Sequence, residues 1–208
     1  MLDLSPIQLK VCGLRDNIEE VVDLRPGFIG LIFYPKSSRY VGDLDVSIVR
    51  QIPKYVKKVG VFVNETKEEV SQVVDKYDLD LVQLHGEESQ EYCAGLKARG
   101  IRLVKVFSGN NLPGRKVLDA YSSFIDYYLF DTRGATYGGT GKTFDWRQLK
   151  DLHLKKPVFI SGGISLDNIS QLAGLDLDLF AVDVNSKFEV SPGLKNIEAL
   201  KKLRAILG

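Results

Sequence analysis

The sequence predicts an α/β fold, a (β/α)8 TIM barrel in which eight parallel strands close on themselves inside a ring of helices. Eight short apolar runs, rich in β-branched and aromatic residues, recur along the 208 residues and alternate with helical patterns. Such alternation is typical of parallel strands joined by crossover helices. The units average about 26 residues, near the compact end of the size range of this barrel. We therefore expect a single barrel domain over residues 1–208.

Each predicted strand is a short apolar run flanked by polar or turn-forming residues. The second, "FIGLIF", and the third, "KVGVFV", are rich in phenylalanine, valine and isoleucine, which favour strands. The first, "IQLKVCG", and the fourth, "LDLVQLH", carry polar residues near their C-terminal ends. In chain order, the predicted strands cover residues 7–13, 28–33, 58–63, 79–85, 102–108, 126–131, 157–163 and 179–185.

The predicted helices fill the intervals between these strands. Asp16 is the expected N-cap of the first helix, and Thr66 with Glu69 has the spacing of a capping box. The helices at 43–53 and 113–122 have a weaker pattern, because each contains a proline near one end. The predicted helices cover residues 16–24, 43–53, 66–77, 87–100, 113–122, 144–152, 165–174 and 194–207.

The main alternative fold is an open, doubly wound sheet, which has the same alternation of strands and helices. Its dinucleotide-binding form carries G-x-G-x-x-G after the first strand. Here the first strand runs into "CGLRDN", which lacks that glycine pattern. The count of eight units and the missing fingerprint favour the closed barrel.

The charge balance and the cysteine content argue against several classes of protein. Lys and Arg number 28 against 27 Asp and Glu, so the chain has neither a basic footprint for nucleic acid nor a polybasic membrane segment. No apolar run approaches the roughly 18 residues of a spanning helix, and the N-terminus lacks a signal-peptide pattern. Two cysteines, Cys12 and Cys93, argue against a disulfide framework. We expect a cytoplasmic monomer or homodimer without nucleic-acid or membrane partners.

The segment "GGTGKTFDW", residues 138–146, resembles the phosphate-binding loop of nucleotide hydrolases. That loop reads G-x-x-x-x-G-K-[ST], with its first glycine five positions before the second. Five positions before Gly141 stands Thr136, and the helix is expected to begin at Asp145 rather than at the Gly-Lys-Thr itself. The spacing therefore excludes a nucleotide-binding loop. An ordinary surface loop is an alternative explanation for the glycines.

The first predicted strand carries a candidate catalytic group. In this fold the active site is built at the C-terminal ends of the strands, where every second side chain points inward. "LKVCG" places Lys10 and Cys12 on one face. A lone cysteine is most often a small buried apolar residue, but a nearby ammonium favours the thiolate and lowers the thiol pKa. Cys12 is therefore a candidate general base or nucleophile.

Three further strands end in polar residues, namely His85, Asp131 and Asp183. Each has a structural alternative: a histidine that only forms hydrogen bonds, and aspartates that cap loops or, for Asp131, pair with Lys142. A carboxyl on the side opposite Cys12 suits a general acid, which makes Asp131 the candidate. We expect His85 and Asp183 to bind substrate.

The seventh predicted strand ends in "SGGIS", residues 161–165. Barrels of this type often bind phosphate with the loops after strands seven and eight and the N-terminus of a short helix. Gly162 and Gly163 would let backbone N–H groups approach an anion, which a helix dipole would favour; an ordinary tight turn is the alternative. No cluster has metal-ligand spacing, since His85 and His153 lie far apart in the chain. We expect a phosphate site and no metal.

Several motifs taken together resemble one enzyme family over essentially the whole chain. They include "KVCG" (10–13), "VQLHGEE" (82–88), "GGTGKTFDW" (138–146) and "SGGIS" (161–165), and "FAVDVNSKFEVSPG" follows at 180–193. In this order they resemble phosphoribosylanthranilate isomerase of tryptophan biosynthesis. The resemblance implies conversion of N-(5-phosphoribosyl)anthranilate to 1-(2-carboxyphenylamino)-1-deoxyribulose 5-phosphate by an Amadori rearrangement. It implies no cofactor and no metal.

The resemblance also implies roles for individual residues. Cys12 matches the general base, Asp131 the general acid, and Arg39 the arginine that binds the anthranilate carboxylate. The reaction then needs a deprotonated Cys12 and a protonated Asp131 near neutral pH. The residues that match the phosphate-binding loops are Gly162, Gly163, Asn185 and Ser186.

Two other functions remain open from the sequence alone. The related phosphosugar isomerase of the histidine pathway would be expected to have an aspartate at position 12, where this chain has Cys12. A non-catalytic phosphate-binding barrel, acting as a partner subunit, could keep the glycine loops but would need neither Cys12 nor Asp131. The presence of both residues favours a catalytic isomerase of a small phosphosugar.

Overall fold

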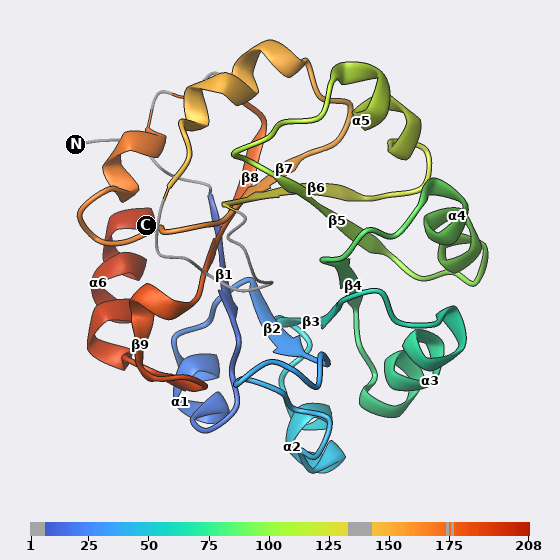
Figure 1. Cartoon of the computed structure of the whole chain (residues 1–208). Helices are drawn as coiled ribbons and strands as arrows, with labels where there is room; N and C mark the ends of the chain where they lie inside the picture. The colour runs from blue at the N-terminus through green and yellow to red at the C-terminus, as the bar shows by residue number, and fades with distance from the viewer. Residues whose placement is uncertain (1–6, 133–142, 174, 176) are drawn as a thin grey trace.

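Eight parallel strands form a closed barrel in the computed structural model, which describes residues 7–132, 143–173, 175 and 177–208. Each strand pairs with the next in chain order, and β1 pairs with β8 to close the ring, which confirms the predicted fold class. Figure 1 shows the helices arranged around these strands. The strands are β1 (Gln8–Cys12), β2 (Phe28–Ile32), β3 (Lys57–Phe62), β4 (Leu81–Leu84), β5 (Leu103–Ser108), β6 (Tyr127–Asp131), β7 (Val158–Ile160) and β8 (Leu179–Val184).

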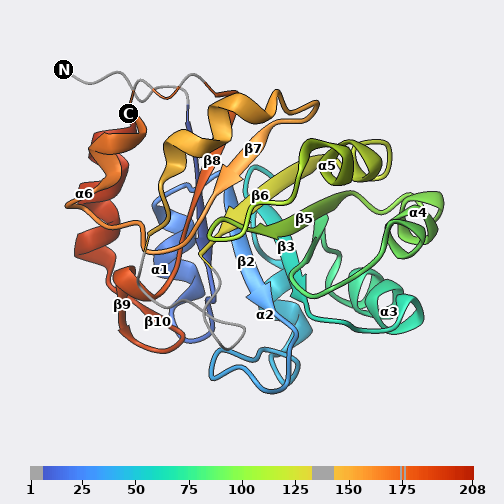
Figure 2. The same ribbon diagram turned by 45° about the horizontal axis from the view of Figure 1, so that its top comes forward.

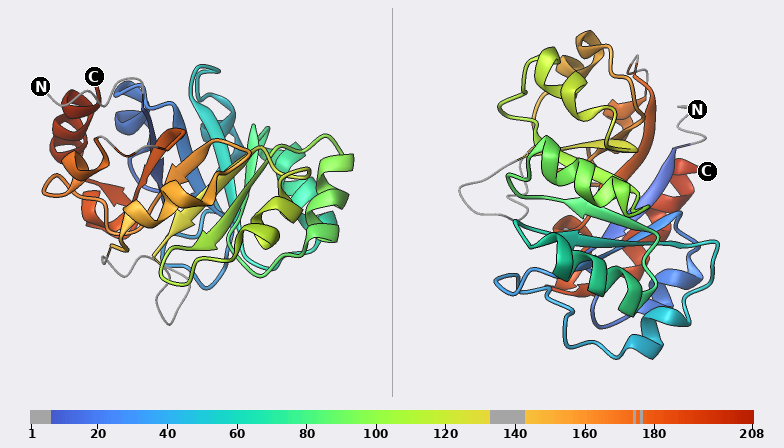
Figure 3. Two further views of the ribbon diagram at one scale, coloured as in Figure 1. Left: turned by 90° about the horizontal axis from the view of Figure 1, so that it is seen from above. Right: turned by 90° about the vertical axis from the view of Figure 1, so that its right-hand side faces the viewer.

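Helices cover the outside of the barrel. In the left panel of Figure 3, the green helices lie on the opposite side from the red C-terminal helix. The α-helices are α1 (Ile18–Asp23), α2 (Val46–Arg50), α3 (Lys67–Tyr77), α4 (Gln90–Ala98), α5 (Arg115–Tyr121) and α6 (Ile197–Leu207). The described residues also contain three 3₁₀ helices: η1 (Trp146–Leu152), η2 (Ile169–Leu172) and η3 (Ser186–Phe188).

Two predicted α-helices are wrong in type. The segments predicted at 144–152 and 165–174 form the 3₁₀ helices η1 and η2, and η2 has only four residues. Apolar spacing of three residues suits a 3₁₀ helix as well as an α-helix, so the pattern alone did not separate them. A four-residue 3₁₀ helix has little macrodipole, which weakens the expected helix contribution to the phosphate site.

The predicted helix caps are partly confirmed. Thr66 accepts a hydrogen bond from the backbone N–H of Glu69, as a capping residue should. The predicted N-cap of the first helix was wrong, because Asn17 rather than Asp16 stands there. The Asn17 side chain exchanges hydrogen bonds with the backbone of Lys195 instead. Those bonds fasten the beginning of α1 to a segment that follows β8.

That segment is a small antiparallel hairpin which the sequence did not predict. It consists of β9 (Glu189–Ser191) and β10 (Leu194–Lys195), and Figure 2 places it beside α1. Gly193, with a φ of 95°, takes the left-handed conformation needed at its turn. The hairpin brings Glu189 and Lys195 to the end of the barrel where the C-terminal ends of the strands lie.

Alternating side chains fill the barrel interior. The inward apolar cluster comprises Phe28, Val59, Leu81, Val104, Val106, Leu129, Phe159 and Ala181. The next inward-facing residue on β4 and on β8 is polar. Gln83 lies two residues after Leu81, and Asp183 lies two residues after Ala181. The fold therefore has an apolar barrel floor beneath a polar layer at the C-terminal ends of the strands. Within the described residues, no helix is long and apolar enough to span a membrane.

Candidate active site

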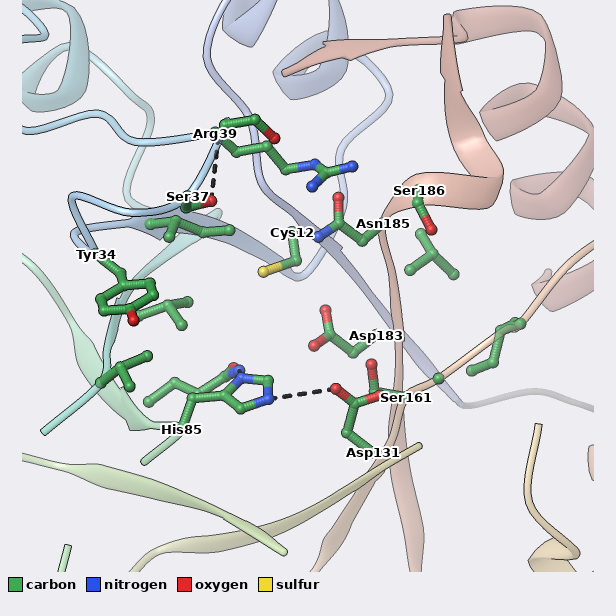
Figure 4. A pocket seen from close by; sticks show the side chains of 18 of the residues that line it. Cys12, Tyr34, Ser37, Arg39, His85, Asp131, Ser161, Asp183, Asn185 and Ser186 are labelled. Atoms are coloured by element: carbon green, nitrogen blue, oxygen red, sulfur yellow. Dashed lines mark hydrogen bonds and ion pairs between the residues drawn. The ribbon is translucent and has the colours of Figure 1, made fainter. Parts of the chain in front are cut away.

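A cavity of about 350 Å³ opens at the C-terminal ends of the strands. Its volume lies in the range of small-molecule sites, roughly 300–1,000 Å³. Figure 4 shows side chains from the strand ends and from the loops that follow them reaching into this space. Every residue that the sequence put forward for the site lines it: Cys12, Arg39, His85, Asp131, Gly162, Gly163, Asp183, Asn185 and Ser186.

Cys12 lies at the end of β1, where its neighbours make room for the sulfur. Its ladder partner on β2 is Gly30, and a Cβ at that position would lie 2.5 Å from Cys12 Sγ. The following residue, Gly13, has a φ of 71°, a conformation that favours glycine. The side chains of Arg39 and Asn185 pack against Gly13 where a Cβ would stand. Two glycines thus allow the sulfur, the guanidinium and the amide to gather at one strand end.

Lys10 lies beneath Cys12 as a fully buried ammonium. Its Nζ donates to Asp183 Oδ2 at 2.8 Å and to Gln83 Oε1 at 2.7 Å. The Asp183 contact follows from the register, since Lys10 and Asp183 are partners across β1 and β8. Burial alone would lower the pKa of Lys10, but the charge of Asp183 raises it above its ordinary value. Lys10 therefore stays positively charged beside Cys12.

The predicted direction of the thiol pKa is wrong for the chain without substrate. Burial raises the pKa of Cys12, and this effect outweighs the opposing influence of the Lys10 ammonium; the Asp183 charge raises it further. The Lys10 ammonium lowers the pKa of the thiol, as expected, but by less than burial raises it. At neutral pH Cys12 is therefore a thiol, and forming the thiolate requires more positive charge nearby.

Replacing Lys10 with methionine is expected to move the ionisation of Cys12 to higher pH, because the ammonium that opposes burial is lost. We expect activity at pH 7 to fall at least about tenfold, since less thiolate can form. The ionisation is measured as the pH-dependent thiolate absorbance that distinguishes the parent chain from its Cys12→Ser variant.

The matched control for this prediction is Lys105→Met. Lys105 is also buried, but it points away from the barrel interior and pairs with Glu88. Its loss should lower stability and leave the Cys12 ionisation in place. If Cys12 ionises at the same pH in Lys10→Met as in the parent chain, Lys10 does not affect the pKa of the thiol.

His85 stands between Gln83 and the candidate acid Asp131. Its Nε2 lies 3.3 Å from Asp131 Oδ2, and its Nδ1 lies 3.3 Å from Gln83 Nε2. Since Lys10 donates to Gln83 Oε1, the Gln83 amide presents its N–H group to His85 Nδ1. That arrangement puts the histidine proton on Nε2, facing Asp131. A chain of polar contacts thus runs from Lys10, beside Cys12, to Asp131. No pattern in the sequence indicated that these residues would be connected.

The predicted phosphate residues come from the loops after β7 and β8. Gly162 and Gly163 both have positive φ, 87° and 68°, and a Cβ at Gly162 would collide with Thr132. Glycine is therefore required at 162 by backbone and space together. Asn185 directly follows β8, and its Oδ1 accepts a hydrogen bond from Lys195 Nζ at 2.8 Å. The buried Lys195 adds a positive charge that the sequence analysis did not consider.

Arg39 lies in the loop after β2 and is paired with Glu189 of the hairpin. Its Nε approaches both Glu189 oxygens, at 2.8 and 3.1 Å, and its Nη2 lies 2.6 Å from Oε2. Burial would raise the pKa of Glu189, but hydrogen bonds from Arg39 and Lys195 hold it below its ordinary value. Glu189 is therefore an ionised carboxylate that the sequence analysis missed.

Part of the glycine-rich segment at 138–146 lies outside the described residues, and so does Lys142, the alternative partner of Asp131. Phe144 is buried, and its ring packs against Gly109 where a Cβ would stand. Among the residues that the structure describes, no three His, Cys, Asp or Glu side chains gather as metal ligands. That no cofactor or metal is used stays a prediction.

The chain is similar in sequence to one family of enzymes. The family model described as N-(5'phosphoribosyl)anthranilate (PRA) isomerase matches residues 9–205. The N-(5'-phosphoribosyl)anthranilate isomerase of Parabacteroides distasonis is 42% identical over 200 residues, covering 93% of this chain and 90% of that protein. The isomerase of Clostridium acetobutylicum is 38% identical over 203 residues, covering 94% and 95%.

Solved structures of the same enzyme share the barrel. The crystal structure of phosphoribosyl anthranilate isomerase from Thermotoga maritima has a TM-score of 0.79 and 31% identity, covering 97% of this chain and 98% of that one. A second crystal structure contains the isomerase in complex with reduced 1-(o-carboxyphenylamino)-1-deoxyribulose 5-phosphate. It has a TM-score of 0.78 and 30% identity, with the same coverage.

Proposed function

The chain belongs to the N-(5'-phosphoribosyl)anthranilate isomerase family, and on this premise we propose that Cys12 and Asp131 carry the proton transfers of its reaction. The enzyme is an isomerase of tryptophan biosynthesis that converts N-(5-phosphoribosyl)anthranilate to 1-(2-carboxyphenylamino)-1-deoxyribulose 5-phosphate. The observation that carries the proposal is that a thiol and a carboxyl, from β1 and β6, line one cavity. General acid and general base catalysis require that arrangement around one sugar.

The reaction begins with ring opening at the acid. Asp131 donates its proton to the furanose ring oxygen, the C1′–O bond breaks, and the nitrogen lone pair forms a protonated imine. Figure 4 shows His85 directed at Asp131, and this contact fixes the orientation of the carboxyl. A carboxyl that delivers a proton to one oxygen gains from such restraint, because proton transfer requires hydrogen-bond distance.

The second step uses Cys12 as the base. The imine cation acidifies the C2′ proton, and Cys12 removes it; the C–H electrons form an enolamine and neutralise the nitrogen. The enolamine tautomerises to the ketone product. Because burial raises the pKa of Cys12, the imine cation has a second effect. The positive charge of the imine close to Sγ favours the thiolate, so Cys12 becomes a base once the imine has formed.

The remaining residues hold the two anionic ends of the substrate. The backbone around Gly162 and Gly163, together with Asn185 and Ser186, accommodates the phosphate at the β7 and β8 ends. Arg39, whose side chain packs against Gly13 next to Cys12, binds the anthranilate carboxylate. The side chains of His85 and Asp183 line the same cavity and contact the rest of the substrate. Asp183 Oδ1 is buried and has no hydrogen-bond partner among the described residues, so it can accept one from a sugar hydroxyl.

Replacing Arg39 with alanine is expected to raise KM on the order of 10-fold to 100-fold and to leave kcat within about threefold, since a charge-assisted carboxylate contact is lost. Steady-state kinetics of the variant measures both constants. Arg99→Ala is the control, because Arg99 also pairs with a glutamate, Glu68, but does so on the exposed surface. An unchanged KM in Arg39→Ala would remove Arg39 from the site.

The activity is tested by adding the protein to phosphoribosylanthranilate and following the loss of its fluorescence. We expect rapid loss with the parent chain. Turnover of only the histidine-pathway substrate, or binding of phosphate without turnover, would instead support the two alternative functions. We also expect a monomer or homodimer, which light scattering measures; a structural neighbour from Thermotoga maritima is described as a dimeric isomerase from which monomers were generated.

A further inference from the structure

Glu189, Lys195 and Arg39 form a connected group beside the active site. Glu189 Oε1 accepts hydrogen bonds from Lys195 Nζ at 2.7 Å and from the backbone N–H of Gly193 at 3.2 Å. Lys195 Nζ also donates to Asn185 Oδ1 at 2.8 Å. The Lys195 side chain is fully buried and that of Glu189 is 5% exposed. The contacts with Lys195 and Gly193 therefore hold the Glu189 carboxylate in place independently of its contact with Arg39.

The contact occupies one particular edge of the guanidinium. Glu189 takes hydrogen bonds from Nε and Nη2, which lie on the side edge of Arg39. A guanidinium has five N–H donors, so the two on Nη1 and the second on Nη2 are not directed at Glu189. Nη1 and Nη2 form the end of the fork, a second edge that can bind a carboxylate bidentately. Arg39 lines the cavity, so this arrangement leaves its fork end for a ligand.

The stem of Arg39 is fixed as well. Its Cδ packs against Gly13, at 2.6 Å from where a Cβ would stand, directly after Cys12. The backbone N–H of Arg39 donates to Ser37 Oγ at 3.1 Å. An arginine side chain has several rotatable bonds, and ordering it on binding would weaken the complex. Contacts at the stem and at the side edge remove most of that freedom in advance.

The charges of the group also suit an anionic substrate. Arg39 and Lys195 carry two positive charges and Glu189 one negative charge, which leaves a net positive charge at this rim. Without Lys195, the carboxylate of Glu189 would cancel Arg39 and repel the anthranilate carboxylate. Because Lys195 pairs with Glu189, Glu189 can orient the guanidinium while this rim keeps a net positive charge that attracts an anion.

We propose that Glu189 is a positioning residue that holds the side edge of Arg39 so that its fork end grips the aromatic carboxylate of the substrate. This inference rests on the proposed role of Arg39. Glu189 does not touch the reacting atoms and acts on substrate binding through Arg39. It therefore determines how strongly the enzyme prefers an aromatic amine that carries an ortho carboxylate over one that lacks it.

The test compares two substrates in each variant. One is phosphoribosylanthranilate and the other is phosphoribosylaniline, the same molecule without its carboxylate; liquid chromatography measures kcat and KM for both. In Glu189→Gln we expect KM for phosphoribosylanthranilate to rise roughly tenfold at nearly unchanged kcat. We expect the constants for phosphoribosylaniline to change less than about twofold. Glu68→Gln, which breaks an exposed Arg–Glu pair, is the control and should change neither.

A second variant separates positioning from folding. Glu189→Asp keeps the negative charge for Lys195 but is too short to span both contacts with Arg39, so it should show the same substrate-dependent loss. A variant that merely folds poorly would lose activity on both substrates equally. Equal losses on both substrates in Glu189→Gln and Glu189→Asp would overturn the proposal, as would no loss on either.

Arg39→Ala distinguishes failure of this inference from failure of the proposed function. If Arg39→Ala impairs only phosphoribosylanthranilate while both Glu189 variants behave like the parent, Arg39 binds the carboxylate without help and the inference fails alone. If Arg39→Ala impairs both substrates to the same extent, the carboxylate role of Arg39 is itself wrong, and the inference fails with it.

Discussion

Replacing Cys12 with serine is expected to lower kcat by a factor on the order of 10² to 10⁴, with the barrel left intact. The serine hydroxyl fills nearly the same volume beside Gly30, but it loses a proton far less readily than a thiol does. The C2′ proton then has no effective base. The loss is measured by substrate fluorescence, and circular dichroism checks the fold.

The control for Cys12→Ser is the same substitution at the other cysteine. Cys93 is also buried, but it belongs to α4 outside the barrel, and burial raises its pKa to about 11. Cys93→Ser should turn over at nearly the parent rate, with some loss of stability from the buried hydroxyl. Near-parental turnover in Cys12→Ser would show that another group removes the C2′ proton.

Asp131→Asn is expected to lower kcat by a similar factor, on the order of 10² to 10⁴, because an amide cannot supply the proton that opens the ring. The amide has nearly the same shape as the carboxyl and fits the same place beside His85 Nε2, so the local geometry is preserved. KM should change much less than kcat, since the phosphate and carboxylate contacts remain. Steady-state kinetics gives both values.

Asp126→Asn is the matched control for Asp131→Asn. Asp126 directly precedes the same strand, β6, but at its opposite end, where it pairs with Lys97. Its loss should affect stability and leave kcat near the parental value. A normal kcat in Asp131→Asn would assign the proton to some other donor and remove Asp131 from the mechanism.

The positions of the site residues could be predicted because they depend on rules that act along the sequence. Side chains alternate along a strand, and parallel strands in a closed barrel bring their C-terminal ends together. Cys12, Asp131 and Asp183 follow from these two rules, since each lies at the end of an apolar run. The same reasoning places Gly162 after the seventh strand.

Glu189 and Lys195 could not be predicted in the same way. They belong to β9 and β10, strands of three and two residues that carry no periodic pattern. The hairpin follows β8, after the eight strand–helix units have been counted, and its contact with Arg39 spans 150 positions in the chain. Nothing local in "SKFEV" indicates that its carboxylate meets an arginine from the second loop.

The direction of the Cys12 pKa depended on burial, which no local pattern contains. The sequence places Lys10 two positions away and so gives the attractive charge. The opposing effect arises because the barrel closes around the sulfur, with Cys12 only 5% exposed. Burial is the largest influence on this thiol, and its size depends on strands that are distant in the chain.

The proposed mechanism requires that the Cys12 thiol and the Asp131 carboxyl flank one bound ribose. A crystal structure of this chain with reduced 1-(o-carboxyphenylamino)-1-deoxyribulose 5-phosphate bound would show whether they do. We expect Cys12 Sγ to face C2′ and an Asp131 oxygen to lie within roughly 2.6–3.2 Å of the oxygen freed by ring opening. A ligand that contacts only one of these two side chains, or that lies outside the cavity, would contradict the proposed mechanism.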